Sequence, residues 1–247
     1  MHQEFKALGR ATGRRCRWLL PLLGTTALAL AACGGGEPAT PTPAGLSPRE
    51  VLDGAAEAMA QVASFSYSLD NQGGETPLPA GLSMKSARGV MVKPDKMTAE
   101  IKASFSGFFV EVKVISLGQR TFMTNPITGS WQTFESGLSP VSFFDPAKGV
   151  GLILQSLTEA SLGEPGVAGG EPAYRVVGRL PAEAVQFMSG SFAEGSVLRA
   201  ELLIGQEDLL LRRVRLEGRV TDDEPEGIVR VLTFSDFNQT FAIEPPV

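Results

Sequence analysis

Short segments in which apolar and polar residues alternate constrain the fold of this chain most strongly. Segment 108–116 places the charged residues Glu111 and Lys113 on one side. The apolar residues lie on the other side and are Phe108, Val110, Val112 and Val114. Segment 209–220 alternates in the same way, apart from Arg212, which falls on the apolar side with Leu210, Val214, Leu216 and Val220. Because successive side chains of a strand point to opposite faces, this pattern predicts an antiparallel sheet with one buried and one solvated face.

Further strands are expected wherever β-favouring residues run between turn signals. These strands are 64–72, 84–93, 96–105, 120–124, 130–134, 173–180, 197–204 and 228–237. Segments 197–204 and 209–220 form an expected hairpin across Gly205–Asp208. The stretch between Gly163 and Gly170 is interpreted as a loop, and the acidic stretch Asp222–Gly227 as a solvated turn.

Three helices are expected among these strands. Ser47-Pro48-Arg49-Glu50 has the pattern of a capping box with proline at the first helical position, and predicts a helix ending near Ala63. Asp145 is the expected N-cap of a helix through about Thr158 that is apolar nearly all round and should be buried on most sides. A shorter helix is expected over Pro181–Met188.

The N-terminus has the pattern of an export signal. Basic residues precede an apolar run from Trp18 to Ala32, which is too short to span a bilayer of roughly 30 Å comfortably. Leu30-Ala31-Ala32-Cys33 resembles the lipobox of bacterial lipoproteins, which implies a lipid on the Cys33 thiol and cleavage after Ala32. The alternative is an ordinary signal peptide with a chance cysteine. The expected parts are a signal peptide (1–32), a lipidated cysteine with a flexible Pro/Thr/Gly-rich linker (33–46) and one domain (47–247).

Composition excludes several classes of function. The signal holds five of the 22 basic and one of the 27 acidic residues, which leaves 17 basic and 26 acidic residues and a net charge of −9. This acidity disfavours nucleic-acid binding. The single histidine is His2 and the only cysteine after residue 32 is Cys33, so histidine-based triads, histidine metal sites and internal disulfides are excluded from the mature chain. We expect that the protein has no enzymatic activity and binds no cofactor or metal. A hydrolase that uses two carboxylates stays open as the last alternative.

Two short motifs connect the chain to a known family. Asn125-Pro126-Ile127-Thr128-Gly129-Ser130-Trp131 resembles a D-P-x-T-G-x-W hairpin, and Leu232-Thr233-Phe234-Ser235-Asp236-Phe237-Asn238 resembles an F-S-D-[YW] closing strand. With the lipobox and the order of elements, residues 47–246 resemble the LppX/LprAFG lipoproteins, which share the fold of the LolA and LolB carriers. The resemblance implies an α+β fold, in which a curved antiparallel half-barrel wraps around a few helices and an apolar cavity takes acyl chains.

Twelve apolar residues are the candidates for lining such a cavity; the alternative is that each is ordinary core. They are Phe108, Val110, Val112, Phe122, Leu152, Ile153, Leu157, Val185, Met188, Leu202, Val214 and Leu216.

The function expected from the anchor, the missing catalytic groups and the resemblance is binding or transfer of lipids or lipoglycans on the extracytoplasmic side of the cell membrane or envelope. The expected partners are the membrane itself, reached through Cys33, a lipid or lipoglycan, and a membrane transporter. The alternative is an anchored protein-interaction or envelope-sensing module with the same fold and no lipid cargo.

Overall fold

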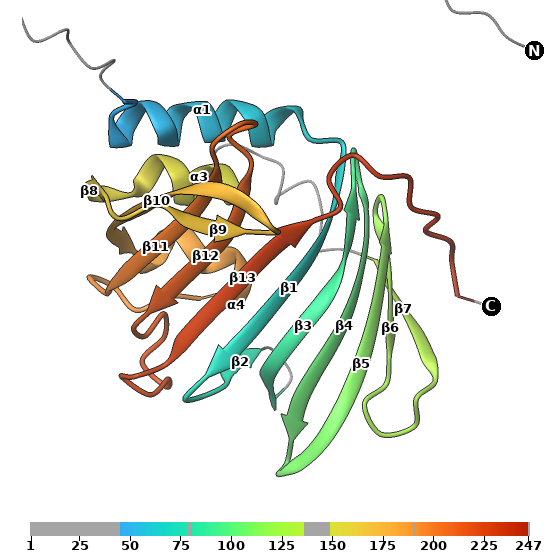
Figure 1. Cartoon of the computed structure of the whole chain (residues 1–247). Coiled ribbons are helices and arrows are strands. Elements are labelled where there is room, and N and C mark those ends of the chain that lie inside the picture. The colour runs from blue at the N-terminus through green and yellow to red at the C-terminus, as the bar shows by residue number, and fades with distance from the viewer. Residues whose placement is uncertain (1–44, 79–80, 136–148, 190, 247) are drawn as a thin grey trace, which may run out of the picture. The chain divides into compact units, whose positions relative to one another are not determined.

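A single antiparallel sheet dominates the computed structural model, which describes residues 45–78, 81–135, 149–189 and 191–246 (Figure 1). The strands run in the order β7-β6-β5-β4-β3-β1-β13-β12-β11-β10-β8, while β2 pairs with β3 and β9 with β10. Their bounds are β1 (Ser64–Gln72), β2 (Thr76–Leu78), β3 (Leu82–Val92), β4 (Lys96–Phe105), β5 (Phe108–Leu117), β6 (Arg120–Thr124), β7 (Trp131–Glu135), β8 (Thr158–Leu162), β9 (Gly166–Ala168), β10 (Glu171–Pro181), β11 (Val197–Gly205), β12 (Leu211–Glu217) and β13 (Val229–Ser235). The predicted α+β class with a curved antiparallel sheet is confirmed.

The first helix, α1 (Pro48–Gln61), begins as the sequence predicts. The Glu50 amide donates to Ser47 Oγ at 3.3 Å and the Ser47 amide donates to Glu50 Oε2 at 2.8 Å, which completes the capping box. Hydrogen bonding of the Glu50 carboxylate by the side chain and the backbone amide of Ser47 holds the pKa of this carboxyl below its usual value. Val51, Leu52, Ala55 and Met59 are buried on one face of the helix. No helix within the described ranges is long and apolar enough to cross a membrane.

The other two predicted helices have different bounds in the described residues. The helix expected over 145–158 is α3 (Val150–Ser156), and its expected N-cap Asp145 lies outside the described residues. The segment Pro181–Met188 begins as the last residue of β10 and continues as a 3₁₀ turn, η2 (Ala182–Val185), followed by α4 (Gln186–Ser189). Val150, Ile153 and Leu154 of α3 are buried, in agreement with the predicted burial of this helix.

Three strands occupy stretches that the sequence pattern did not identify. β9 lies inside the expected loop 163–170, β8 begins at Thr158, and β2 falls in a Pro- and Gly-rich stretch. β8 lies at the sheet edge, where most of its side chains are exposed. It therefore lacks the apolar alternation that marks a half-buried strand. β12 ends at Glu217, earlier than the predicted 220.

A β-bulge explains why Arg212 interrupts the apolar side of its segment. Leu203 pairs with Arg213 while Ile204 pairs with Leu211, so Arg212 has no pairing partner in β11. A bulge shifts the alternation by one residue. Leu211, rather than Leu210, is therefore the buried residue.

The expectation of a solvated acidic turn at 222–227 is wrong for one residue. Glu224 is 3% exposed, and its carboxylate forms an ion pair with Arg230, which is fully buried. A carboxylate with a buried cationic partner can be accommodated inside the fold. Because the partner lies on the following strand β13, the local acidic composition did not reveal it.

Residues Gly45–Val247 form one compact unit, and every residue of the described hydrophobic core falls within it. A chain without residues 1–44 therefore keeps all the contacts of the described core.

Candidate functional site

One face of the sheet carries a continuous row of apolar residues from β10 to β5. The row follows successive antiparallel pairs and consists of Val176, Leu202, Val214, Leu232, Leu69, Ala87, Ile101 and Val112. Paired residues in an antiparallel sheet project to the same face. This face, which we call the inner face, is therefore apolar across most of the width of the sheet.

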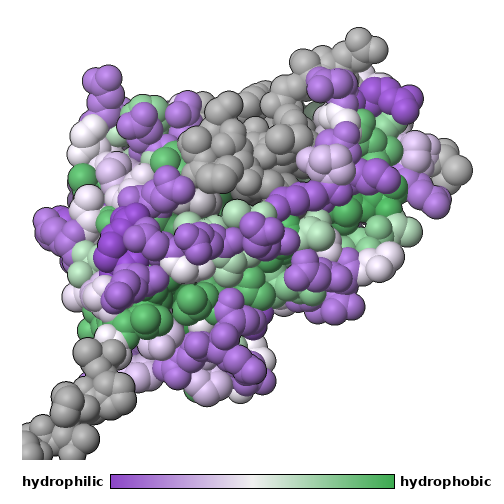
Figure 2. Space-filling model, turned by 90° about the horizontal axis from the view of Figure 1, so that it is seen from above, coloured by the Kyte–Doolittle hydropathy of each residue, from purple (hydrophilic) through white to green (hydrophobic). Residues whose placement is uncertain are grey.

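The described helices cover mainly one end of the inner face. α1 contacts α3 and β8, and both α3 and η2 contact β10. In agreement with this placement, Val176, Leu202 and Val214 have no exposed surface. Figure 2 shows the molecule from the α1 end, where hydrophobic side chains gather in a band between hydrophilic ones.

Toward the other end of the sheet, several apolar side chains of the inner face stay half-buried. These residues define the β3–β6 apolar surface and are Ala87, Ile101, Phe105, Val110 and Met123. The register places every charged residue of β4 and β5 on the opposite face, namely Lys96, Glu100, Lys102, Glu111 and Lys113. An apolar lining with few polar groups suits a hydrophobic ligand.

Small residues shape the middle of this surface. Gly89 pairs with Tyr67 on one side and Ala99 on the other. A Cβ atom at Gly89 would lie 1.9 Å from the Thr98 carbonyl oxygen, so a larger residue does not fit there. The Tyr67 hydroxyl donates to that same oxygen at 3.0 Å. Burial of the hydroxyl raises the pKa of Tyr67 well above its ordinary value because it disfavours the phenolate.

Most of the residues predicted to line a cavity come together on the inner face or on the helices against it. Val112, Leu202 and Val214 belong to the apolar row, and Leu216 lies in the adjacent row between Ala200 and Arg230. Five of the predicted residues belong to the helical segments: Ile153, Leu157 and Val185 are buried, and Leu152 and Met188 are half-buried. Seven of the predicted residues are members of the core cluster: Val112, Ile153, Leu157, Val185, Leu202, Val214 and Leu216. Their lining of a ligand cavity stays a prediction.

Two of the predicted residues are not covered on the inner face: Phe108 lies at its uncovered end, and Phe122 lies on the other face. Phe108 is 74% exposed at the end of the β4–β5 hairpin. Phe122 pairs with Ile115 and Thr133, so it lies on the outer face, opposite to Val112 and Val114. The composition of β6 did not indicate which of its faces would be buried, because that depends on its register with β5.

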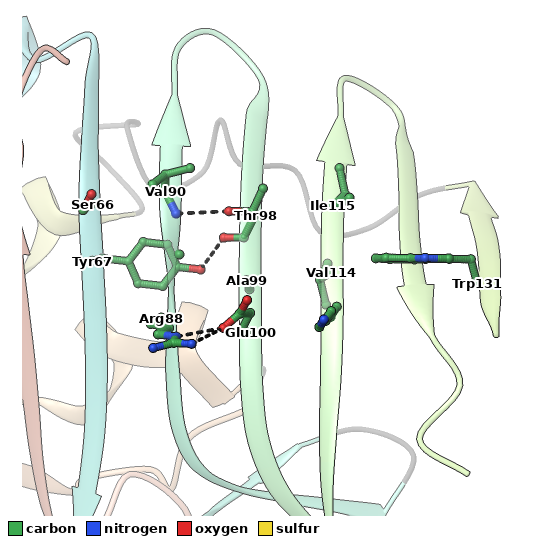
Figure 3. Close-up of a pocket in the computed structure, with 12 residues that line it drawn as sticks. Ser66, Tyr67, Arg88, Val90, Thr98, Ala99, Glu100, Val114, Ile115 and Trp131 are labelled. Carbon is green, nitrogen blue, oxygen red and sulfur yellow. Dashed lines mark hydrogen bonds and ion pairs between the residues drawn. The ribbon is translucent and has the colours of Figure 1, made fainter. Parts of the chain in front are cut away.

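The outer face carries a groove of about 550 Å³ that sequence reasoning missed (Figure 3). Its lining comes mostly from outer-face residues of β1, β3, β4 and β5, together with Trp131 of β7. Arg88 and Glu100 form an ion pair at 2.6 Å there, and this contact raises the pKa of Arg88. Residues from five strands meet in this groove only through the sheet register, so no compact motif marks it.

The described residues offer no group of three or more His, Cys, Asp or Glu side chains that could hold a metal ion. The candidate binding surfaces are the apolar inner surface and the amphipathic outer groove.

Comparisons with known proteins agree with this architecture. The model of the LppX_LprAFG lipoprotein family matches residues 47–243. The structure of LprF from Mycobacterium bovis is similar with a TM-score of 0.66 and 13% identity, covering 81% of this chain and 96% of that one. LppX from Mycobacterium tuberculosis is similar with a TM-score of 0.57 and 17% identity, covering 80% and 98%. At these identities the likenesses show the fold. A search of curated protein sequences finds no match.

Proposed function

Because the chain belongs to the LppX_LprAFG lipoprotein family, we propose that it binds acyl chains of lipids or lipoglycans against the inner face of its sheet and passes them between sites in the cell envelope. The observation that carries this proposal is the β3–β6 apolar surface, where half-buried apolar side chains lie on a face free of charged residues on β4 and β5. Acyl chains need such a surface to leave water, at a gain of about 0.8 kcal/mol per buried CH₂ group.

Native mass spectrometry of the protein purified from its own host tests the cargo. We expect adducts whose mass corresponds to diacyl or larger lipids, and fatty acids released from the sample by hydrolysis beyond those of the anchor. A protein that carries only the lipid attached to its own cysteine would contradict the proposal. The same sample after delipidation and refolding is the control, since it should take up added lipid again.

The second part of the proposal is a lipid anchor on Cys33, which holds the domain at the extracytoplasmic side of a membrane. Two acyl chains anchor a protein stably, whereas one does so only marginally. Residues 34–46 would then connect the anchor to the domain.

Fractionation of cells tests the anchor. We expect Cys33→Ser to move the protein out of the membrane fraction or to leave it unprocessed, because the modified thiol is lost. Cys16→Ser is the matched control, since it removes the other cysteine and should leave the distribution unchanged. Equal membrane association of both variants, with the signal cleaved in both, would exclude Cys33 as the anchor.

The outer groove favours a second candidate function, in which a protein partner such as a membrane transporter docks there. Its aromatic ring, apolar floor and exposed ion pair are typical of a protein-binding surface. A stoichiometric protein partner in a sample without bound lipid would favour this function over lipid carriage.

A further inference from the structure

Two adjacent phenylalanines stand at the end of the β4–β5 hairpin with almost no cover. Phe108 is 74% exposed and Phe109 is 89% exposed. Burial of a phenylalanine side chain is worth roughly 1.5–3 kcal/mol, so exposed rings on two successive residues indicate a binding role. Figure 1 shows that this hairpin end lies on the side of the sheet away from α1 and projects beyond the neighbouring turns.

The turn that presents these rings is tight. Ser106 and Gly107 both have positive φ, 48° and 83°, and Phe105 pairs directly with Phe108 across them. Two central residues of positive φ are typical of the two-residue type I′ hairpin, which matches the twist of the strands. The rings therefore project from a short closed turn and not from a long loop.

The two rings point to opposite faces because they are successive residues of one strand. Phe108 continues the inner face, on which Phe105 and Val110 follow, whereas Phe109 lies on the outer face beside its pairing partner Ser104. A solid protein surface would contact one side of such a thin hairpin. A fluid lipid layer can enclose both sides at once, which favours a bilayer as the occupant.

The distribution of charge agrees with shallow insertion of this tip. Residues 103–110 contain no charged side chain in a chain of which 20% of residues are charged. Charged groups begin directly above it: Ser104 Oγ donates to Glu75 Oε2 at 2.6 Å, and Lys102 pairs across the strands with Glu111. These groups would stay in water or at the headgroups, since charges are expensive inside the hydrocarbon.

A third exposed apolar side chain lies at the same end of the sheet. Ile127 is 77% exposed in the turn between β6 and β7, and the antiparallel order of β4 to β7 directs this turn and the β4–β5 turn to the same end. Trp131 follows this turn and is half-buried. Aromatic residues with one apolar and one polar side are enriched where proteins meet the membrane interface.

We propose that the β4–β5 hairpin tip, Phe105–Phe109, docks the domain onto a lipid bilayer by inserting Phe108 and Phe109 between the lipids. The tip also leads along the inner face through Phe105 and Val110 into the β3–β6 apolar surface, so a docked tip places that surface next to the lipids. The docking itself needs neither the anchor nor a bound cargo.

Co-sedimentation with phosphatidylcholine vesicles tests the proposal on a chain that begins at residue 34, which keeps the whole compact unit but lacks Cys33. These zwitterionic lipids suit a tip without cationic groups. We expect Phe108→Ser/Phe109→Ser to weaken the partition by at least about tenfold, from the apolar surface removed. Val167→Ser is the matched control, because Val167 is also exposed but lies on β9, and it should bind as the unsubstituted chain does.

A position-sensitive measurement accompanies the binding assay. In a Trp131→Phe background, a Phe109→Trp reporter should shift its emission to shorter wavelength on addition of vesicles and be quenched by brominated acyl chains. Circular dichroism should show the same fold for all variants, since Phe108, Phe109 and Val167 are exposed and Trp131→Phe keeps an aromatic ring at a half-buried position. Equal sedimentation of the double variant and the unsubstituted chain, or an emission that vesicles leave unchanged, would overturn the proposal.

Discussion

Glu224→Gln is expected to lower the free energy of unfolding by about 3–5 kcal/mol, because it leaves the Arg230 guanidinium buried without its counter-charge. Both side chains of this ion pair have no exposed surface. The remaining Arg230 donors reach Gly218 O at 3.0 Å and Thr76 Oγ1 at 3.3 Å, neither of which carries a charge. Denaturant unfolding followed by circular dichroism measures the loss.

The pair has a clear structural role that explains so large an effect. Glu224 Oε2 accepts the amides of Val220 and Thr221 at 2.7 and 3.2 Å, and its other oxygen contacts Arg230 of β13. The carboxylate therefore ties the 218–228 connection to the sheet, and Arg230 extends the tie to β2 through Thr76. Loss of the charge weakens three segments at once.

Two further variants test whether the stability lost in Glu224→Gln comes from the unpaired charge of Arg230. Glu100→Gln removes one partner of the exposed Arg88–Glu100 pair, whose side chains are 71% and 42% exposed, and should change the stability by no more than about 1 kcal/mol. Glu224→Gln/Arg230→Met removes both charges but keeps a side-chain oxygen for the amides of Val220 and Thr221, and should recover much of the stability lost in Glu224→Gln. A Glu224→Gln variant as stable as Glu100→Gln would show that the buried pair contributes little.

Ile101→Glu is expected to reduce lipid binding at least about tenfold, because an acyl chain on the inner face would have to displace water from a carboxylate. Ile101 belongs to the apolar row and is half-buried on the β3–β6 apolar surface. The amount of lipid that co-purifies with the protein, measured against protein mass, reports the effect.

Ile115→Glu is the matched control for this change. Ile115 is also half-buried and lies on the neighbouring strand β5, but its side chain points to the outer groove. It should leave the co-purified lipid unchanged. The reverse result, with lipid lost in Ile115→Glu and kept in Ile101→Glu, would assign the lipid to the outer groove and refute the inner face as the binding surface.

Much of the fold followed from local patterns. The alternation of β5 places Val112 and Val114 on the buried side and Glu111 and Lys113 on the exposed side, as the structure confirms. The capping box sets the start of α1 through two hydrogen bonds within four residues. Such features depend on neighbours in the chain, so the sequence alone contains the physics that decides them.

The predicted site was only partly accessible to the same reasoning. Val112, Leu202 and Val214 were recognised as inward-facing residues, but their alignment in one row depends on pairs such as Leu69 with Leu232. The sequence alone shows neither that Phe122 faces outward nor that Phe108 stays uncovered, because the pairing of β6 and the length of the β4–β5 hairpin cannot be read from these segments. The outer groove could not be predicted either, because its lining residues come together only through the pairing of the strands.

The sequence by itself determined which residues are apolar on each strand, where α1 starts, and that the chain after residue 32 lacks histidine. Only the tertiary structure decided which strands are neighbours, that Glu224 is buried against Arg230, and that the tip at Phe108 and Phe109 stays uncovered. The physical reason is the range of the interactions. Alternation and capping act over a few residues, whereas burial depends on strand pairs and helix contacts between segments far apart in the chain.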